Sequence, residues 1–169
     1  MLISSIRNDN PIIFLEHKML YNMKGEVPED SYELPLFKAD IKQPGSDVTV
    51  VAYSRMLHFA LEAAQNLAEE GISVEVIDPR TIYPIDKETI INSVAKTGRL
   101  VILQEAPKTM GYAAEISAIM AEEVFEYLRA PIKRVAALDV PVAFAPVLED
   151  YVMPKVDDVI KAVKEIIEY

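Results

Sequence analysis

The sequence predicts an α/β fold in which a mostly parallel sheet is covered by helices on both faces. Apolar runs typical of strands alternate with segments whose apolar residues recur at helical spacing. Strands without polar interruption suit a parallel sheet that is covered on both sides. The clearest stretch is residues 47–86, which contains a strand, a crossover helix and a second strand. This is a βαβ unit, and its crossover is expected to be right-handed.

The elements of this unit have readable boundaries. The first strand is predicted at residues 47–53, directly after Pro44, Gly45 and Ser46. Gly71 is predicted to end the helix in a left-handed conformation, before a second strand at residues 72–78. The helix between them is predicted from apolar residues at helical spacing, namely Leu57, Ala60, Leu61, Ala64, Leu67 and Ala68.

The alternation continues towards the carboxyl terminus. The final helix is predicted to follow Pro154, with Asp157 and Asp158 in its first turn to favour the helix dipole. The remaining predicted elements are a helix at 87–96, a turn at Thr97 and Gly98, a strand at 99–104, a helix at 111–128, a strand at 132–138 and the final helix at 155–167.

The first 46 residues do not follow this rhythm. A helical turn and a strand at 11–15 are predicted before a polar stretch that Pro28, Pro35 and Pro44 interrupt. Such a long connection predicts that two domains are joined. Residues 39–42 are the one place in it where a short edge strand is expected.

Composition limits the classes of function. The chain has 169 residues, of which 51% are hydrophobic, and it has no cysteine, which excludes disulfides, thiolate zinc sites and thiol catalysis. A net charge of −10 argues against nucleic-acid binding, because phosphate contacts depend on Lys and Arg. No membrane-spanning run and no signal-peptide pattern is seen, so we expect a soluble cytoplasmic chain without membrane partners.

Five segments, in order, resemble the later half of the β-subunit of thiamine-diphosphate-dependent 2-oxo acid dehydrogenases. They are SSIRNDNPIIFLEHKMLY, EVPEDSYELPLFKADIKQPGSDVTVVAY, EVIDPRTIYPID, KTGRLVILQEAPKTMGYAAEIS and LEDYVMPKVDDVIKAV. These β-subunits belong to the decarboxylating components of the pyruvate and branched-chain 2-oxo acid dehydrogenase complexes. The third and fourth segments are more similar to the branched-chain members.

The resemblance implies a domain organisation. Residues 45–169 resemble the transketolase carboxy-terminal domain, a three-layer α/β/α domain with a five-stranded, mostly parallel mixed sheet. Its antiparallel strand would come from residues 39–42. Residues 1–21 resemble the tail of a truncated pyrimidine-binding domain, and residues 22–44 would be the linker.

The resemblance also implies that the catalytic residues lie in another part of the enzyme. In this family the carboxylate that activates the cofactor and the active-site histidine lie upstream of the part that this chain matches. We therefore expect the chain to bind no cofactor and to be inactive alone, while thiamine diphosphate and magnesium would be held by the full assembly. That assembly would oxidatively decarboxylate a 2-oxo acid and transfer the acyl group to lipoyl lysine. Its other members would be an α-subunit and a second β-subunit.

The resemblance suggests three candidate sites. Ser5, Asn8 and Asn10 match a turn that binds potassium in branched-chain members, although an ordinary Asn-rich turn is the alternative. Lys108 and Gly111 lie between a strand end and a helix start, where an anion could bind, although packing across a dimer is the alternative.

The third site would bind the acyltransferase core. The family uses its terminal carboxylate, here that of Tyr169, and an acid before an Ala-Pro pair. Arg129 occupies that acidic position, and it would repel a basic partner, which argues against docking in the usual mode.

Two histidines complete the inventory of candidates. His58 lies four residues before Glu62, which predicts a surface pair. His17 lies near the expected domain junction, where an active-site role is the less favoured reading. No nucleophile, base and orienting group can be assembled from the sequence. A free-standing, non-enzymatic α/β binding module is therefore the alternative to a dehydrogenase subunit.

Overall fold

The computed structural model describes residues 1–169 and contains one five-stranded mixed sheet. The strands are β1 (Asp40–Gln43), β2 (Val48–Ala52), β3 (Val74–Asp78), β4 (Leu100–Pro107) and β5 (Lys133–Ala137). The α-helices are α1 (Leu2–Ile6), α2 (Arg55–Glu69), α3 (Lys87–Thr97), α4 (Tyr112–Glu123), α5 (Pro146–Val152) and α6 (Val156–Ile167). Short 3₁₀ helices lie at η1 (Lys18–Leu20) and η2 (Phe125–Tyr127).

The sheet has the order β1-β3-β2-β4-β5 and confirms the predicted mixed topology. Strand β2 pairs in parallel with β3 and β4, and β4 pairs in parallel with β5. Strand β1 pairs antiparallel with β3, as predicted for the segment near residues 39–42. The carboxyl ends of the central strands therefore meet at one edge of the sheet.

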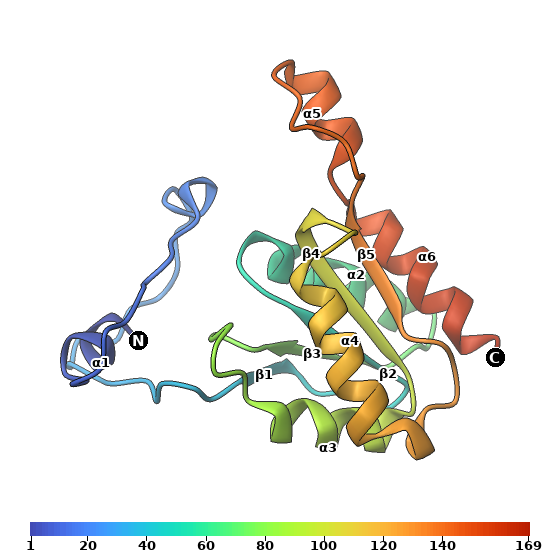
Figure 1. Cartoon of the computed structure of the whole chain (residues 1–169), viewed down its shortest axis with the longest axis horizontal. Coiled ribbons are helices and arrows are strands. Elements are labelled where there is room, and N and C mark those ends of the chain that lie inside the picture. Colours follow the sequence, from blue (N-terminus) through green and yellow to red (C-terminus); the bar gives the residue numbers. More distant parts are fainter.

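Two hydrophobic cores make three layers (Figure 1). The first core joins one face of the sheet to α2 and α6, with Leu67 and Val163 among its fully buried residues. The second joins the other face to α3 and α4, where Ile90 and Ile116 are fully buried. Helix α3 ends at the predicted turn, where Gly98 has φ 71°, and Gly71, just after the C-cap of α2, has φ 82°, the left-handed conformation that the sequence predicts for it.

The structure differs from the elements predicted from the sequence at four places. Residues 11–15 form no strand, because they have no neighbouring strand with which to pair. The predicted helix at 111–128 ends at Glu123 and continues as η2, while β4 runs to Pro107. Helix α5 was not predicted, since its apolar residues face solvent and so do not show the pattern of a core helix.

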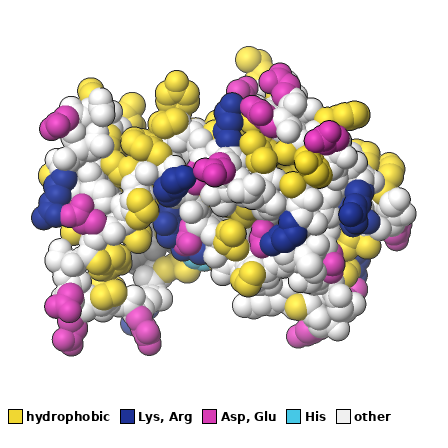
Figure 2. Space-filling model, turned by 90° about the horizontal axis from the view of Figure 1, so that it is seen from below, with side chains coloured by type: hydrophobic (Ala, Val, Ile, Leu, Met, Phe, Trp, Pro, Cys, Tyr) yellow, Lys and Arg dark blue, Asp and Glu magenta, His cyan; other side chains and the backbone are white.

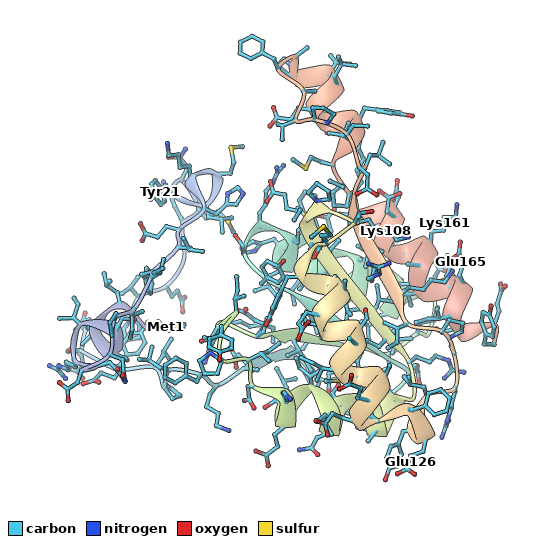
Figure 3. All side chains as sticks on the ribbon, viewed as in Figure 1. Met1, Tyr21, Lys108, Glu126, Lys161 and Glu165 are labelled. Atoms are coloured by element: carbon cyan, nitrogen blue, oxygen red, sulfur yellow. The ribbon has the colours of Figure 1, made fainter.

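Two segments extend away from this body in Figure 1. Residues 1–38, here called the N-terminal arm, include α1, and the chain reverses near Tyr21, which Figure 3 labels, and runs back towards α1 before it reaches β1. Residues 139–152, here called the α5 arm, expose Phe144, Val147 and Tyr151. Figure 2 shows the arm and the body as two masses with hydrophobic side chains on both surfaces. None of the helices is both long enough and apolar enough to span a membrane.

Candidate functional site

A group of polar residues gathers at the carboxyl edge of the sheet. Tyr53 and Arg55 follow β2, Glu105 lies near the end of β4, and Tyr112 begins α4. In open α/β sheets this edge is where ligands usually bind. The N-terminal arm brings His17 to the same edge, because its ring lies 2.9 Å from Glu105.

His17, Glu105 and Arg55 form a partly buried polar group. His17 Nε2 lies 2.9 Å from Glu105 Oε2, and Arg55 Nη1 lies 4.0 Å from the other carboxylate oxygen, Oε1. The exposed fractions of these side chains are 23% for His17, 29% for Glu105 and 34% for Arg55. The Arg55 guanidinium also lies 5.3 Å from the centre of the Phe59 ring, where a cation–π contact orients it.

The second nitrogen of His17 is also occupied. The Met19 backbone N–H donates to His17 Nδ1 over 3.2 Å, so this nitrogen is an acceptor. In a neutral imidazole the other nitrogen then carries the proton, and Nε2–H donates to Glu105. With both nitrogens engaged, His17 has no free lone pair with which to take a proton from a substrate.

Two tyrosines cover the neighbouring part of the edge. The rings of Tyr53 and Tyr112 lie 6.2 Å apart at 76°, an edge-to-face contact. The Tyr112 hydroxyl donates to the Ile82 carbonyl, and burial raises the pKa of Tyr112 to about 12. Burial and the charge of Glu105 also raise the pKa of Tyr53. Both phenols therefore keep their protons at neutral pH, and the Tyr112 hydroxyl acts as a donor.

The loop between β4 and α4 holds the predicted anion residues, Lys108 and Gly111. Lys108 is exposed, and its carbonyl accepts a hydrogen bond from Arg134 over 3.1 Å. A Cβ at Gly111 would lie 1.8 Å from Gln104 Nε2, so the close approach of Gln104 requires glycine. Gln104 Oε1 accepts from the Ala113 N–H over 2.6 Å, which already satisfies one amide at the start of α4. Anion binding here stays a prediction.

The predicted potassium turn is organised by its own side chains. Asn8 Oδ1 accepts from both the backbone and the side-chain N–H of Asn10, each over 3.0 Å. Ser5 Oγ donates to the Met1 carbonyl over 3.1 Å. No cluster of three or more His, Asp or Glu side chains able to hold a metal occurs in the chain. Potassium binding through backbone carbonyls stays a prediction.

The other predicted residues lie elsewhere on the surface. Arg129 is exposed, and its N–H donates to the Gly98 carbonyl over 2.8 Å. Tyr169 is 73% exposed, so the terminal residue is accessible, as a docking role requires. The predicted surface pair of His58 and Glu62 is not formed, because His58 is half-buried on α2 and makes no hydrogen bond or ion pair with Glu62.

The arrangement binds segments together and contains no assembled catalytic set. The sequence named His17 but missed its contact with Glu105, since 88 positions separate the two residues and no short-range pattern links them. Arg55 was missed altogether, because one basic residue at a helix start is common on protein surfaces.

Comparison with known proteins gives one family match. Residues 37–159 match the model described as "Transketolase, C-terminal domain". This match begins just before β1, so it includes the whole sheet. The fold class predicted from the sequence is confirmed by this match and by the structural comparison below.

The curated relatives are β-subunits of dehydrogenase-type enzymes. The chain is 46% identical over 167 residues to the acetoin:2,6-dichlorophenolindophenol oxidoreductase subunit beta of Bacillus subtilis, covering 99% of this chain and 49% of the relative. It is 44% identical to the 2-oxoisovalerate dehydrogenase subunit beta of the same organism, covering 100% of this chain and 52% of the relative. The chain therefore spans about half the length of the curated relatives it matches.

A solved structure shows the same fold. A chain described as a split gene transketolase, an inactive beta4 tetramer, superimposes with a TM-score of 0.71 and 29% sequence identity. The superposition covers 85% of this chain and 46% of that chain.

Proposed function

The chain belongs to the transketolase C-terminal domain family, and from this premise we propose that it supplies the assembly domain of a thiamine-diphosphate-dependent dehydrogenase β-subunit. The observation that carries the proposal is identity of 44–46% to such β-subunits over nearly the whole chain. The proposed reaction of the full assembly is oxidative decarboxylation of a 2-oxo acid with acyl transfer to lipoyl lysine.

The residues present do not fit a role in holding the cofactor. Thiamine diphosphate needs a carboxylate at its aminopyrimidine and a divalent ion at its diphosphate. Glu105 is engaged by His17 and faces Arg55, and no carboxylate cluster able to hold a divalent ion occurs in the chain. We therefore assign no step of the chemistry to this chain, and propose that an α-subunit and a second β-subunit complete the enzyme.

The proposed role is to hold partners, and the exposed surface is consistent with it. The α5 arm exposes Phe144 completely and Val147 by 81%. The N-terminal arm exposes Ile13 by 88% and Leu15 by 76%. Exposed apolar residues on this scale are typical of surfaces that contact other chains.

Two reactions are candidates for the full assembly, and they differ in their substrate. A relative at 46% identity is named for acetoin, whereas another at 44% is named for 2-oxoisovalerate. We favour the 2-oxo acid because segments 81–86 and 105–117 resemble the branched-chain members. Acetoin cleavage is the second candidate.

Reconstitution tests the proposal. The chain is co-expressed with an α-subunit and with the first half of the Bacillus subtilis 2-oxoisovalerate dehydrogenase subunit beta as a separate polypeptide. We expect a complex on size-exclusion chromatography that decarboxylates 2-oxo acids in the presence of thiamine diphosphate and magnesium, while the chain alone is inactive. A complex that cleaves only acetoin would select the second candidate. No association with either polypeptide would favour a free-standing binding module.

A further inference from the structure

A single polar link connects most of the N-terminal arm to the body. The arm has its own internal contacts, since Ser4 donates to the Leu34 carbonyl over 2.6 Å and Arg7 pairs with Glu33. Its root is held at residues 38 and 39, which contact Asp86. Between these, residues 1–37 make one hydrogen bond to residues 45–169, the contact between His17 and Glu105. The position of the arm therefore depends on this contact more than on any other polar group.

The geometry makes this contact directional. His17 Nδ1 is held as an acceptor by the Met19 N–H, so Nε2–H must be the donor to Glu105. Arg55 Nη1 lies 4.0 Å from the second oxygen of Glu105, so the carboxylate is contacted from both sides. The three side chains come from three segments, namely the arm, the start of α2 and the end of β4.

We propose that His17, Glu105 and Arg55 form a latch that positions the N-terminal arm at the carboxyl edge of the sheet. The two nitrogens of His17 have separate tasks: Nδ1 shapes the η1 turn, and Nε2 attaches that turn to the body. An ordinary surface ion pair would need only a positive charge at position 17 and would show no preference between the two nitrogens. The latch is independent of the proposed enzymatic function, because it requires only this chain.

Two substitutions of His17 test the roles of its ring nitrogens separately. In His17→Asn the side-chain oxygen can replace Nδ1 as the acceptor for Met19, but the side chain is too short to reach Glu105. In His17→Gln the amide nitrogen can replace Nε2 as the donor to Glu105, while the acceptor near Met19 is lost. A latch predicts that His17→Gln retains the arm and His17→Asn releases it.

Hydrogen exchange of the full chain, followed by mass spectrometry, measures the release. In His17→Asn and Glu105→Leu, peptides covering residues 18–24 should exchange about fivefold faster than in the wild type, as expected for one partly shielded, charge-assisted hydrogen bond. In His17→Gln the Met19 N–H loses its acceptor, but exchange in residues 20–24 should stay within about twofold of the wild type. The double variant His17→Asn/Glu105→Leu should exchange no faster than either single variant, because both remove the same contact.

Two controls keep the test specific. His58→Asn changes the only other histidine, which has no hydrogen-bond partner, and should leave exchange in residues 18–24 unchanged. Exchange in β2 should stay slow in every variant, which shows that the body remains folded. The latch is overturned if His17→Asn exchanges like the wild type, if His17→Gln and His17→Asn are equally fast, or if the double variant shows the sum of two independent effects.

Discussion

Replacing Lys96 by Met should destabilise the body strongly, because Lys96 is the cationic partner of a buried carboxylate. Glu75 lies on β3 and is only 1% exposed. Its Oε2 pairs with Lys96 Nζ and accepts from the Gly45 N–H over 3.2 Å, whereas Oε1 has no hydrogen-bond partner. The carboxylate is therefore poorly solvated, and most of its stabilisation comes from Lys96.

The expected loss in the free energy of unfolding follows from the dependence of Glu75 on Lys96. Removing one partner of a buried ion pair costs about 3–5 kcal/mol, because a charge is left buried without compensation. Since the Lys96 side chain is 48% exposed, the lower end applies, and we expect a loss of about 3 kcal/mol in the free energy of unfolding. For a chain of this size that corresponds to a melting temperature lower by roughly 6–12 °C.

A double-mutant cycle measured by urea unfolding tests the reasoning. Glu75→Met should cost about 1 kcal/mol, because it leaves the Gly45 N–H unpaired while Lys96 can move into solvent. In the Glu75→Met background, Lys96→Met should cost about 0–0.5 kcal/mol, because no buried charge is left. Equal costs of Lys96→Met in the two backgrounds would refute the interpretation, as would a cost below about 0.5 kcal/mol in the wild-type chain.

The pH dependence gives an independent check on the same pair. Burial raises the pKa of Glu75, but hydrogen bonds, led by that from Lys96, more than offset it, so the pKa lies below its ordinary value. Its stabilising contribution is therefore present above the ordinary pKa of about 4.3 and is lost as the pH falls through the folded-state pKa. In Lys96→Met the carboxyl group protonates more readily, so the difference in stability between variant and wild type should shrink at acidic pH.

Two further predictions concern the junction between linker and body. Gly45→Ala should cost about 2 kcal/mol or more in the free energy of unfolding, because the new Cβ would lie 2.2 Å from a backbone carbon of β3. Gly25→Ala is the matched control, because a Cβ at Gly25 has no atom within 4 Å. Equal stability of the two variants in urea would contradict the prediction. Asp86→Ala should cost about 1–2 kcal/mol, because Asp86 caps α3 through Thr89. Burial raises the pKa of Asp86, but hydrogen bonds from Ala39 and Thr89 lower it by more, so the folded-state pKa lies below its ordinary value. The stabilisation from this cap should therefore be lost as the pH falls through the folded-state pKa. A cost of Asp86→Ala that does not change with pH would contradict the assignment.

The elements of the body were readable because their patterns are local. Uninterrupted apolar runs predicted β2, β3 and β4, and Gly71 and Gly98 predicted the ends of two helices. The arms were harder to predict, because their apolar residues do not face an intrachain core. For this reason the prediction of a strand at residues 11–15 was wrong, and helix α5 was not predicted.

The amino-acid sequence by itself determined the α/β class, the mixed sheet and the resemblance to a family, since helical period, strand composition and ordered motifs are properties of the chain. Only the tertiary structure decided which polar groups meet. It brought His17 to Glu105 across 88 positions, used Gln104 to occupy the space beside Gly111, and placed Glu75 beside Lys96 under α3. Such contacts depend on how strands and helices pack, which no local pattern in the sequence encodes.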